Sequence, residues 1–249
     1  MELTGATVLV TGGARGIGRE MTRLLVGLGA HVVAVGRAPG PLAALRLEYG
    51  DRVSTEAVDL SDPDAVDAFG DELPGRHPGL SVVINNAGVQ NLCDFLTADA
   101  RDSRPALRRE LAVNLDAVIS LSTGLLPHLS SHSSAAIVNI TSGLAIVPKA
   151  SAPVYCAAKS AVRTFTRSLR YQCEDGAPHI RVIDAVLPLV DTEMTRGRGQ
   201  GKISPAQAAQ AVIDGIRRDR AEIYIGKARL LPFLMRLSPT LGYRALRNG

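Results

Sequence analysis

The sequence predicts an α/β fold in which helices cover both faces of one central parallel sheet, a doubly wound three-layer α/β/α arrangement. Apolar, β-branched runs alternate with helix-length segments along most of the 249 residues. These runs are apolar throughout, which is typical of parallel strands buried on both faces. We expect about seven strands joined by right-handed crossovers. The sequence contains neither a Pro/Gly/Ser-rich linker nor an internal repeat, so residues 1–249 are predicted to form a single domain.

The predicted elements follow one another in a regular order. Six strands can be placed, at residues 7–12, 31–37, 52–60, 80–88, 135–142 and 180–188. Helices are predicted at residues 19–30, 41–50, 62–73, 104–129, 155–173 and 204–218. The last helix has a typical start, because Ser204 is a capping residue and Pro205 suits the first helical position. Before it, the glycine- and cation-rich stretch "TRGRGQGKIS" predicts a mobile substrate loop at about 193–204.

Composition excludes several classes of protein. No run reaches the roughly 18 uncharged apolar residues of a membrane span, and the amino terminus has no secretory signal pattern. Cys93, Cys156 and Cys173 form neither a CxxC pair nor a cluster with metal-ligand spacing, so no metal site is expected. An odd, sparse set of cysteines suits a reducing compartment. We therefore expect a soluble cytoplasmic protein.

The charge balance is modestly basic, with a net charge of +4. Nucleic acid is not an expected partner, because the charges are scattered and only four Phe and five Tyr could stack on bases. We attribute part of the positive charge to binding of an anionic cofactor.

The stretch "TGGARGIG", residues 11–18, directly follows the first predicted strand and opens the first helix. A strand, a glycine turn and a helix start place backbone N–H groups against a phosphate. Gly12 can turn the chain, Gly16 can admit a pyrophosphate, and Gly18 can let the helix pack closely on the strand. Taken alone, the turn is equally compatible with a tight connection that binds nothing.

The end of the second strand bears on the choice of cofactor. In a dinucleotide fold, a carboxylate about 20 residues beyond the glycines holds the adenosine ribose. This chain has Gly36 and Arg37 there. Arg37, with Arg15 from the glycine turn, matches a 2′-phosphate, so NADP(H) is expected in preference to NAD(H). Each arginine by itself could equally be a solvated surface residue.

Tyr155 and Lys159 lie four residues apart in a predicted helix, so their side chains share one face. The reference pKa of a phenol is near 10, and a nearby ammonium can lower it toward neutrality. Such a tyrosine is a suitable general acid for ketone reduction, or a base for alcohol oxidation. Ser142 ends the strand "AAIVNITS" and is placed to hydrogen-bond a substrate oxygen. In isolation, each residue also has an ordinary structural explanation.

The ordered set "TGGARGIG", "NNAG" (85–88), Asn114, Ser142 and "YCAAK" (155–159) resembles the classical short-chain dehydrogenase/reductase family, from Thr7 to about Ile216. The resemblance implies a Rossmann-type fold and hydride transfer between a nicotinamide and a carbonyl or secondary alcohol. It also implies that Tyr155 is the general acid/base beside Ser142 and Lys159, and that Asn114 holds a water in a proton relay toward Lys159. The resemblance implies that the helices with broad apolar faces pair across a homodimer or homotetramer interface, and burial within the monomer is the competing explanation for those faces.

The same resemblance implies further cofactor contacts. They are Ile17, Asp59, Leu60, Asn86, Ala87, Gly88, Pro188, Val190 and Thr192, in addition to Gly12, Arg15, Gly16, Gly18, Arg37, Tyr155 and Lys159. Asp59 would contact the adenine amino group, although it also lies in a helix-capping region. The segment "LPLVDTEM" departs from the family pattern, since Leu189 replaces the usual glycine after Pro188. With the carboxyl-terminal sequence, this resembles the bacterial DltE-like oxidoreductases.

The predicted substrate pocket is mostly apolar and suits a medium-sized ketone or alcohol. Its walls are expected to be Leu144, Ala145, Pro148, Val154 and Leu189, with Gln90 and Asn91 at the rim. The cations of the 193–204 loop could close on an acidic substrate or simply be solvated. The segment "LLPFLMRLSPTL" could cover the core, complete an oligomer contact or touch a membrane surface.

Two functional hypotheses remain at this point. The first is an NADP(H)-dependent reductase of carbonyls, or of imines, that works through Tyr155. The second is a non-catalytic, NADP-binding regulator or scaffold on the same fold. The intact Ser142, Tyr155 and Lys159 set favours the first hypothesis, because a protein that only binds the cofactor does not need it.

Overall fold

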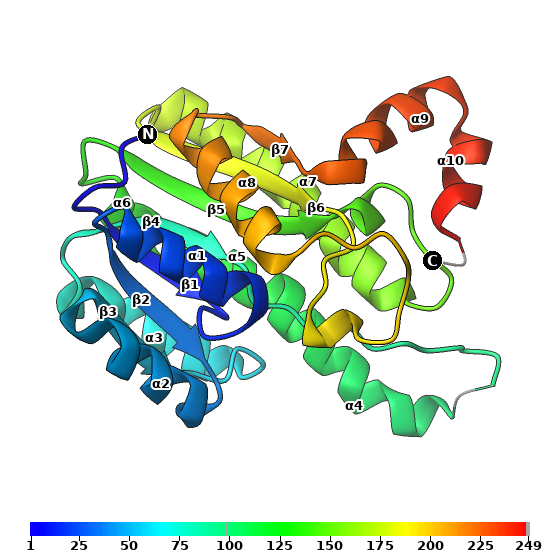
Figure 1. The fold of residues 1–249 in the computed structure, drawn as a ribbon, viewed down its shortest axis with the longest axis horizontal. Coiled ribbons are helices and arrows are strands. Elements are labelled where there is room, and N and C mark those ends of the chain that lie inside the picture. The colour runs from blue at the N-terminus through cyan, green and yellow to red at the C-terminus, as the bar shows by residue number, and fades with distance from the viewer. Residues whose placement is uncertain (98, 248–249) are drawn as a thin grey trace.

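The computed structural model describes residues 1–97 and 99–247, and its centre is one parallel sheet (Figure 1). The sheet has seven strands in the order β3-β2-β1-β4-β5-β6-β7. Their bounds are β1 Thr7–Thr11, β2 His31–Gly36, β3 Val53–Ala57, β4 Leu80–Asn85, β5 Ala135–Ser142, β6 Ile180–Leu187 and β7 Glu222–Tyr224. All strands are parallel, but successive strands are added toward one edge from β1 to β3 and toward the other edge from β4 to β7. The switch between β1 and β4 creates the crevice where ligands bind in such folds.

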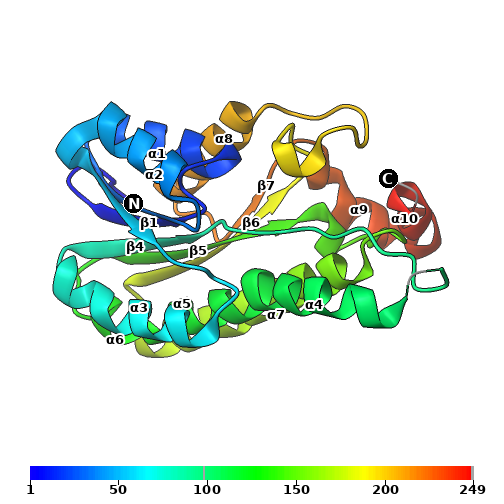
Figure 2. The same ribbon diagram turned by 90° about the horizontal axis from the view of Figure 1, so that it is seen from below.

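Helices cover both faces of the sheet (Figure 2). The helices are α1 Gly16–Gly27, α2 Pro39–Tyr49, α3 Pro63–Arg76, α4 Ala100–Leu111, α5 Ala117–Gly124, α6 Leu126–Leu129, α7 Pro153–Gly176, α8 Pro205–Arg217, α9 Leu231–Leu237 and α10 Pro239–Leu246. One apolar core joins the sheet to α1, α2 and α8. A second core joins the opposite face to α3, α5, α6 and α7. The predicted three-layer α/β/α fold with a Rossmann-type parallel sheet is therefore confirmed.

Local sequence explains where several helices begin. Ser204 accepts a hydrogen bond from the Gln207 backbone N–H at 3.1 Å, and the Gln207 side chain accepts one from the Ser204 N–H at 2.9 Å. This reciprocal cap, followed by Pro205, fixes the start of α8 as predicted. Asp62 caps α3 by accepting from the Ala65 N–H at 3.3 Å. Asp59, three residues earlier, is therefore not the cap of this helix.

The structure differs from the sequence prediction at two elements. The seventh strand, β7, has only three residues, and no run of apolar residues marks it in the sequence. Ile223 anchors it, since this buried side chain packs closely on Gly215 of α8. The single helix predicted at 104–129 is instead α4, a π-helical turn at Ala112–Asp116, α5 and α6. Pro127 lies at the start of α6, where a missing N–H is tolerated.

A buried hydrogen-bond network connects β4, β5 and two helices. Asn85 donates to Ser122 at 3.0 Å and to the side-chain oxygen of Asn139 at 2.8 Å. Asn139 in turn donates to the hydroxyl of Thr166 at 2.9 Å, and Thr166 donates to the carbonyl of Val162 at 2.7 Å. The network fixes the middle of α7 on the sheet at Thr166.

Ion pairs hold the same helix against β6 and β7. Arg163 lies 3.0 Å from the carboxylate of Asp184, which is almost fully buried in β6. Arg163 also hydrogen-bonds Tyr224, and Glu222 pairs with Arg167. Burial raises the pKa of Asp184, although its hydrogen bond from Thr141 and the Arg163 charge oppose that rise.

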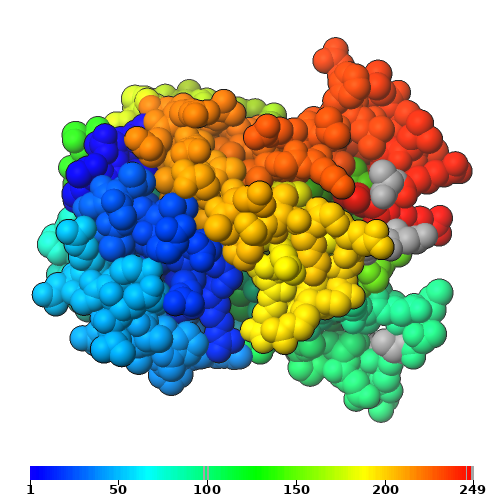
Figure 3. All heavy atoms as spheres, viewed as in Figure 1, coloured from blue at the N-terminus to red at the C-terminus, as the bar shows by residue number. Residues whose placement is uncertain are grey.

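The carboxyl-terminal helices α9 and α10 lie beside the carboxyl edge of the sheet and project from the main body (Figure 3). The side chain of Leu231 packs closely on Gly143, since it would be 2.8 Å from a Cβ at that position. The backbone N–H of Ala150 donates to the carbonyl of Arg247 at 2.9 Å. This segment therefore contacts the loop after β5. Within residues 1–97 and 99–247, no helix has the length and hydropathy needed to cross a membrane.

Candidate active site

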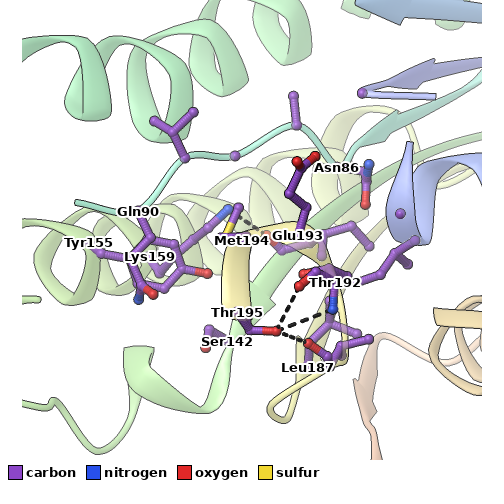
Figure 4. A pocket seen from close by; sticks show the side chains of 18 of the residues that line it. Asn86, Gln90, Ser142, Tyr155, Lys159, Leu187, Thr192, Glu193, Met194 and Thr195 are labelled. Atoms are coloured by element: carbon purple, nitrogen blue, oxygen red, sulfur yellow. Dashed lines mark hydrogen bonds between the residues drawn. The ribbon is translucent and has the colours of Figure 1, made fainter. Parts of the chain in front are cut away.

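One cavity of about 890 Å³ runs along the carboxyl ends of the strands. The glycine turn and the end of β2 line one part of it, and Ser142, Tyr155 and Lys159 line another. Figure 4 shows Tyr155, Lys159 and Gln90 on one side of this pocket and Asn86 and Glu193 on the other. Its volume lies within the range of about 300–1,000 Å³ that is usual for cofactor and ligand sites.

The glycine turn has the close contacts that its sequence predicts. Gly12 and Gly16 have positive φ values of 67° and 52°, which favour glycine. At Gly18, a Cβ would lie 2.1 Å from the carbonyl oxygen of Gly12, so any side chain would displace α1 from the strand. Gly18 does not line the cavity, and its role is this close packing.

The first turn of α1 leaves backbone donors available to a ligand. Its N-cap residue, Arg15, has extended backbone geometry and makes no side-chain capping bond. The first turn also carries no acidic residue. Free N–H groups and the helix dipole favour an anion at this position, which borders the cavity at Gly16 and Ile17.

The two predicted phosphate-binding arginines lie at this end of the cavity. Arg37 is 3.8 Å from the carboxylate of Asp59, and Arg15 is 3.7 Å from the carboxylate of Glu193. All four side chains are largely exposed to solvent. Exposed pairs of this length contribute little free energy, so a phosphate can compete for both guanidinium groups. Asp59 is oriented by the Ser61 hydroxyl, which donates to it at 2.7 Å and is the main cause of its lowered pKa.

Ser142, Tyr155 and Lys159 come together where β5 ends and α7 begins. Ser142 lies close enough to Tyr155 to act on the pKa of its hydroxyl, and the Ser142 oxygen accepts the Leu144 backbone N–H at 3.1 Å. The Lys159 ammonium lies 6.0 Å from the centroid of the Tyr155 ring. It also donates to the carbonyl of Ile140 at 2.9 Å, which fixes it beneath the tyrosine in the interior.

Burial controls the pKa values of this pair. It raises the pKa of Tyr155 to about 12, although the Ser142 hydrogen bond acts in the opposite direction. It lowers the pKa of Lys159 to about 8, with the Asp184 charge opposing that shift. The lowered tyrosine pKa expected from the sequence is therefore wrong for the protein alone, because desolvation outweighs the favourable charges. At neutral pH Tyr155 is a neutral phenol, suited to donate a proton.

Asn114 lies in the π-helical turn between α4 and α5 and does not line the cavity. Its side-chain oxygen accepts the Val89 backbone N–H at 2.9 Å, and its amide donates to the Val89 carbonyl at 2.7 Å. A Cβ at Gly88 would lie 3.1 Å from this oxygen and 3.8 Å from the Lys159 nitrogen. Asn114 therefore fixes the backbone of Val89, beside Lys159. Its location in a π-helical turn is typical of residues at functional sites.

The segment after β6 lies over the glycine turn. Pro188, Val190 and Thr192 line the cavity, and the Thr192 methyl would be 3.5 Å from a Cβ at Gly16. Leu189 faces the cavity and also packs against Gly199, where a Cβ would lie 2.3 Å from it. The leucine that replaces the family glycine therefore contacts the 193–204 loop. That loop is further held by Arg198, which donates to Gln90 at 2.9 Å.

The cofactor contacts expected from the resemblance mostly border this cavity, as do three of the predicted substrate contacts. Those that line it are Gly12, Arg15, Gly16, Ile17, Arg37, Asp59, Leu60, Asn86, Ala87, Gly88, Tyr155, Lys159, Pro188, Val190 and Thr192, with Gln90, Leu144 and Leu189 for the substrate. Their roles toward a bound ligand stay predictions.

The predicted pocket wall needs correction at four positions. Pro148, Ala145, Val154 and Asn91 do not line the cavity. Pro148 is exposed, whereas its neighbours Val147 and Lys149 are both buried. Asn91 instead donates from its side chain to Glu110 at 3.1 Å.

Sequence reasoning also missed several residues of the site. Lys149, Arg109, Lys227, Leu231 and Leu246 line the cavity. Thr11 connects β1 to the "NNAG" loop, because its hydroxyl accepts the N–H groups of Asn86 and Ala87 at 2.9 and 3.0 Å. An apolar strand that ends in a single threonine was the available signal for Thr11. No comparable signal in the sequence marks Leu231 or Leu246. They line the cavity because α9 and α10 fold back beside the site, which local sequence does not predict. Across the described chain, no His, Cys, Asp and Glu side chains group as a metal site would require.

Comparison with known proteins establishes the family. Residues 6–202 match the family model for short chain dehydrogenases. The chain belongs to the short-chain dehydrogenase family. Its similarity to DltE-like oxidoreductases is also confirmed, since it is 34% identical over 229 residues to an uncharacterized oxidoreductase, DltE, of Bacillus subtilis. That alignment covers 90% of this chain and 89% of the Bacillus protein.

Two further similar proteins have a named activity or a bound ligand. The chain is 33% identical to L-xylulose reductase of Bos taurus, over 87% of this chain and 83% of that enzyme. A short chain dehydrogenase from Burkholderia cenocepacia, solved in complex with NADP, superposes with a TM-score of 0.86 at 27% identity and covers 100% of both chains. The chain is thus an oxidoreductase of a family that binds nicotinamide cofactors.

Proposed function

We propose that this protein is an NADP(H)-dependent reductase that transfers a hydride between the nicotinamide and a carbonyl or secondary alcohol, with Tyr155 as the general acid/base. The observation that carries the proposal is the convergence of Ser142, Tyr155 and Lys159 on the cavity that also contains the glycine turn. Relatives named as oxidoreductases and as a reductase support the same class of reaction.

The residues present fit a dinucleotide cofactor. Gly16 has no side chain and a positive φ where a pyrophosphate would approach, and α1 presents uncapped N–H groups there. The family neighbour from Burkholderia cenocepacia holds NADP. Arg15 and Arg37, with no carboxylate at the end of β2, support a preference for the 2′-phosphorylated form.

Each catalytic side chain has a distinct role in this proposal. The bound cofactor supplies the hydride. Ser142 hydrogen-bonds the substrate oxygen and positions it near the Tyr155 hydroxyl. Tyr155 donates its proton to that oxygen, and the Lys159 ammonium stabilises the phenolate that remains. Asn114 would hold a water that returns a proton toward Lys159.

The experiment that tests this function follows NADPH oxidation by the purified protein with a panel of ketones, keto esters and cyclic imines. Turnover of carbonyl compounds supports the proposal, and turnover restricted to imines would replace it with an imine reductase. Binding of NADPH with no turnover across the panel would favour the non-catalytic regulator.

We also propose a cytoplasmic homodimer or homotetramer. Cys93, Cys156 and Cys173 are free thiols, which suits a reducing compartment. Sedimentation equilibrium at several protein concentrations would show a monomer if the oligomer proposal is wrong.

The pH dependence of reduction should follow Lys159. Its pKa of about 8 is the lower of the two, because Tyr155 titrates only near 12. Loss of the ammonium above pH 8 removes the charge that stabilises the phenolate, so kcat/KM for NADPH-dependent reduction should fall as pH rises through about 8. Initial rates at subsaturating substrate, measured in buffers of constant ionic strength, give this profile. A flat profile through this range would contradict the role of Lys159.

Replacement of Arg37 should reduce the preference for NADPH. Its guanidinium is exposed and held only by the long contact to Asp59, so Arg37→Ala removes a phosphate ligand without creating a buried defect. We expect kcat/KM for NADPH to fall about ten- to hundredfold, with a much smaller change for NADH. Arg46→Ala, on the exposed surface of α2, is the matched control. Equal losses with both cofactors would contradict 2′-phosphate recognition by Arg37.

A further inference from the structure

The proposed function assigns no role to Lys149, a buried cation of the cavity wall. Only 8% of this residue is exposed, although it follows the exposed Pro148. Its backbone is fixed against the first turn of α7, since its N–H donates to the sulfur of Cys156 at 3.5 Å. The side chain borders the same cavity as Tyr155 and Leu144.

Lys149 has no anionic partner in the described part of the chain. Its ammonium takes part in none of the hydrogen bonds or ion pairs of residues 1–97 and 99–247, although the residue itself is largely buried. Two carboxylates line the cavity, and each is engaged elsewhere, Asp59 with Arg37 and Glu193 with Arg15.

The nearest charges to Lys149 reinforce its positive potential. Burial and then the charge of Arg198 lower the pKa of the Lys149 ammonium. The same arginine acts on the pKa of Tyr155, so it lies near the reacting hydroxyl as well. Glu110 is buried nearby, but it bonds Asn91, does not line the cavity, and burial raises its pKa toward the neutral acid.

The residue is largely buried, but its nitrogen is not among the fully buried unpartnered atoms and so still contacts the solvent of the cavity. Such an ammonium is partly desolvated and has no compensating charge beside it. An anionic group from a ligand would supply that compensation. The position of Lys149 on the Tyr155 side of the cavity, away from the glycine turn, indicates that the group belongs to the substrate rather than to the cofactor pyrophosphate.

Leucine side chains contribute to the cavity wall, together with the polar Gln90 and the cations Arg109 and Lys227. The leucines come from three separate regions of the chain and are Leu144, Leu189, Leu231 and Leu246. A ligand that satisfies both Lys149 and these leucines has a hydrocarbon body and one anionic end.

We propose that the substrate is an amphiphilic oxo acid, whose carboxylate or phosphate binds Lys149, with Arg198 reinforcing the site, while its carbonyl faces Tyr155. This inference rests on the proposed reductase function and adds the chemical class of the substrate. The carboxylate and phosphate forms share the same recognition chemistry, and the experiment compares them.

The test uses matched pairs of ketones that differ in one anionic group. 5-Oxohexanoate and 2-hexanone differ by a carboxylate in place of a terminal methyl, and hydroxyacetone phosphate and hydroxyacetone differ by the phosphate. We expect the wild-type protein to prefer the anion of at least one pair in kcat/KM. In Lys149→Met, the ratio of kcat/KM for anion over neutral ketone should fall about ten- to hundredfold.

Arg46→Met is the matched control, because it removes an exposed cation of α2 outside the cavity and should keep the ratio. Thermal unfolding checks the fold of Lys149→Met, which should be at least as stable as the wild type once the unpaired charge is gone. Equal ratios in the wild type and Lys149→Met would overturn the proposal while leaving the reductase function intact.

A binding measurement separates failure of this inference from failure of the proposed function. Calorimetry with hexanoate, hexyl phosphate and 1-hexanol is run on the protein alone and with saturating NADPH. If no ketone is reduced but hexanoate or hexyl phosphate binds and binding is lost in Lys149→Met, the anion site stands and the reductase function fails. If the two anions bind wild type and Lys149→Met equally, or bind neither, the anion site is refuted.

Discussion

The replacement Tyr155→Phe should lower kcat for carbonyl reduction by about 10²- to 10⁴-fold, the usual contribution of a positioned general acid. The phenyl ring has the same shape and keeps its place at the start of α7, so only the hydroxyl is lost. The Ser142 hydroxyl cannot replace it, because Ser142 is held by the Leu144 N–H and lacks an adjacent ammonium.

Steady-state kinetics and NADPH binding measured on the same preparation check this result. Binding should be retained, since the glycine turn and Arg37 are unchanged. Tyr171→Phe, an exposed position later on the same helix, is the control and should keep wild-type rates. Retention of more than about a tenth of the wild-type kcat in Tyr155→Phe would refute proton donation by this residue.

The second large effect is on stability. Arg163→Met should lower the free energy of unfolding by about 3–5 kcal/mol at neutral pH, because Asp184 would remain buried without its partner 3.0 Å away. The pKa of Asp184 is already raised by burial, and loss of Arg163 raises it further. Because the carboxyl pKa is raised in the folded state, a lower pH protonates Asp184 and removes its unpaired buried charge. The difference in free energy of unfolding between the wild type and Arg163→Met should therefore shrink as pH falls toward 5.

Urea unfolding at the two pH values measures both parts of this expectation. Arg181→Met, an exposed position at the start of β6, is a suitable control for loss of a cation. The double variant Arg163→Met/Asp184→Asn should recover part of the stability, because the buried charge is gone. A loss below about 1 kcal/mol that does not vary with pH would show that the pair contributes no more than a surface salt bridge.

Sequence alone predicts the parts of this protein that depend on short-range spacing. The apolar runs of β1, β2, β4, β5 and β6 appear where they are expected, because continuous burial requires continuous apolar sequence. The glycine turn is equally predictable, because it depends on local geometry. Gly12 and Gly16 have positive φ values, and a side chain at Gly18 would clash with the Gly12 backbone. The shared helix face of Tyr155 and Lys159 is predictable because the two residues are one turn apart. Both line the same cavity as Ser142.

The features that sequence reasoning missed depend on long-range packing. Pro148 was expected in the pocket wall, but it is exposed, and the buried Lys149 beside it lines the cavity instead. The direction of the Tyr155 pKa shift depends on how many atoms surround the ring, which spacing does not reveal. β7 forms because Ile223 fits against Gly215, and three residues carry no periodic signal.

The buried network of Asn85, Ser122, Asn139 and Thr166 has a consequence for how this sequence can diverge. Each member satisfies another, so changing one side chain leaves a buried donor or acceptor without a partner. Exchange of both partners for apolar groups of similar shape is far less costly than exchange of one. A substitution at one of the four positions is therefore expected to need a compensating change at its partner, and this coupling constrains Thr166 of α7, the helix that carries Tyr155 and Lys159.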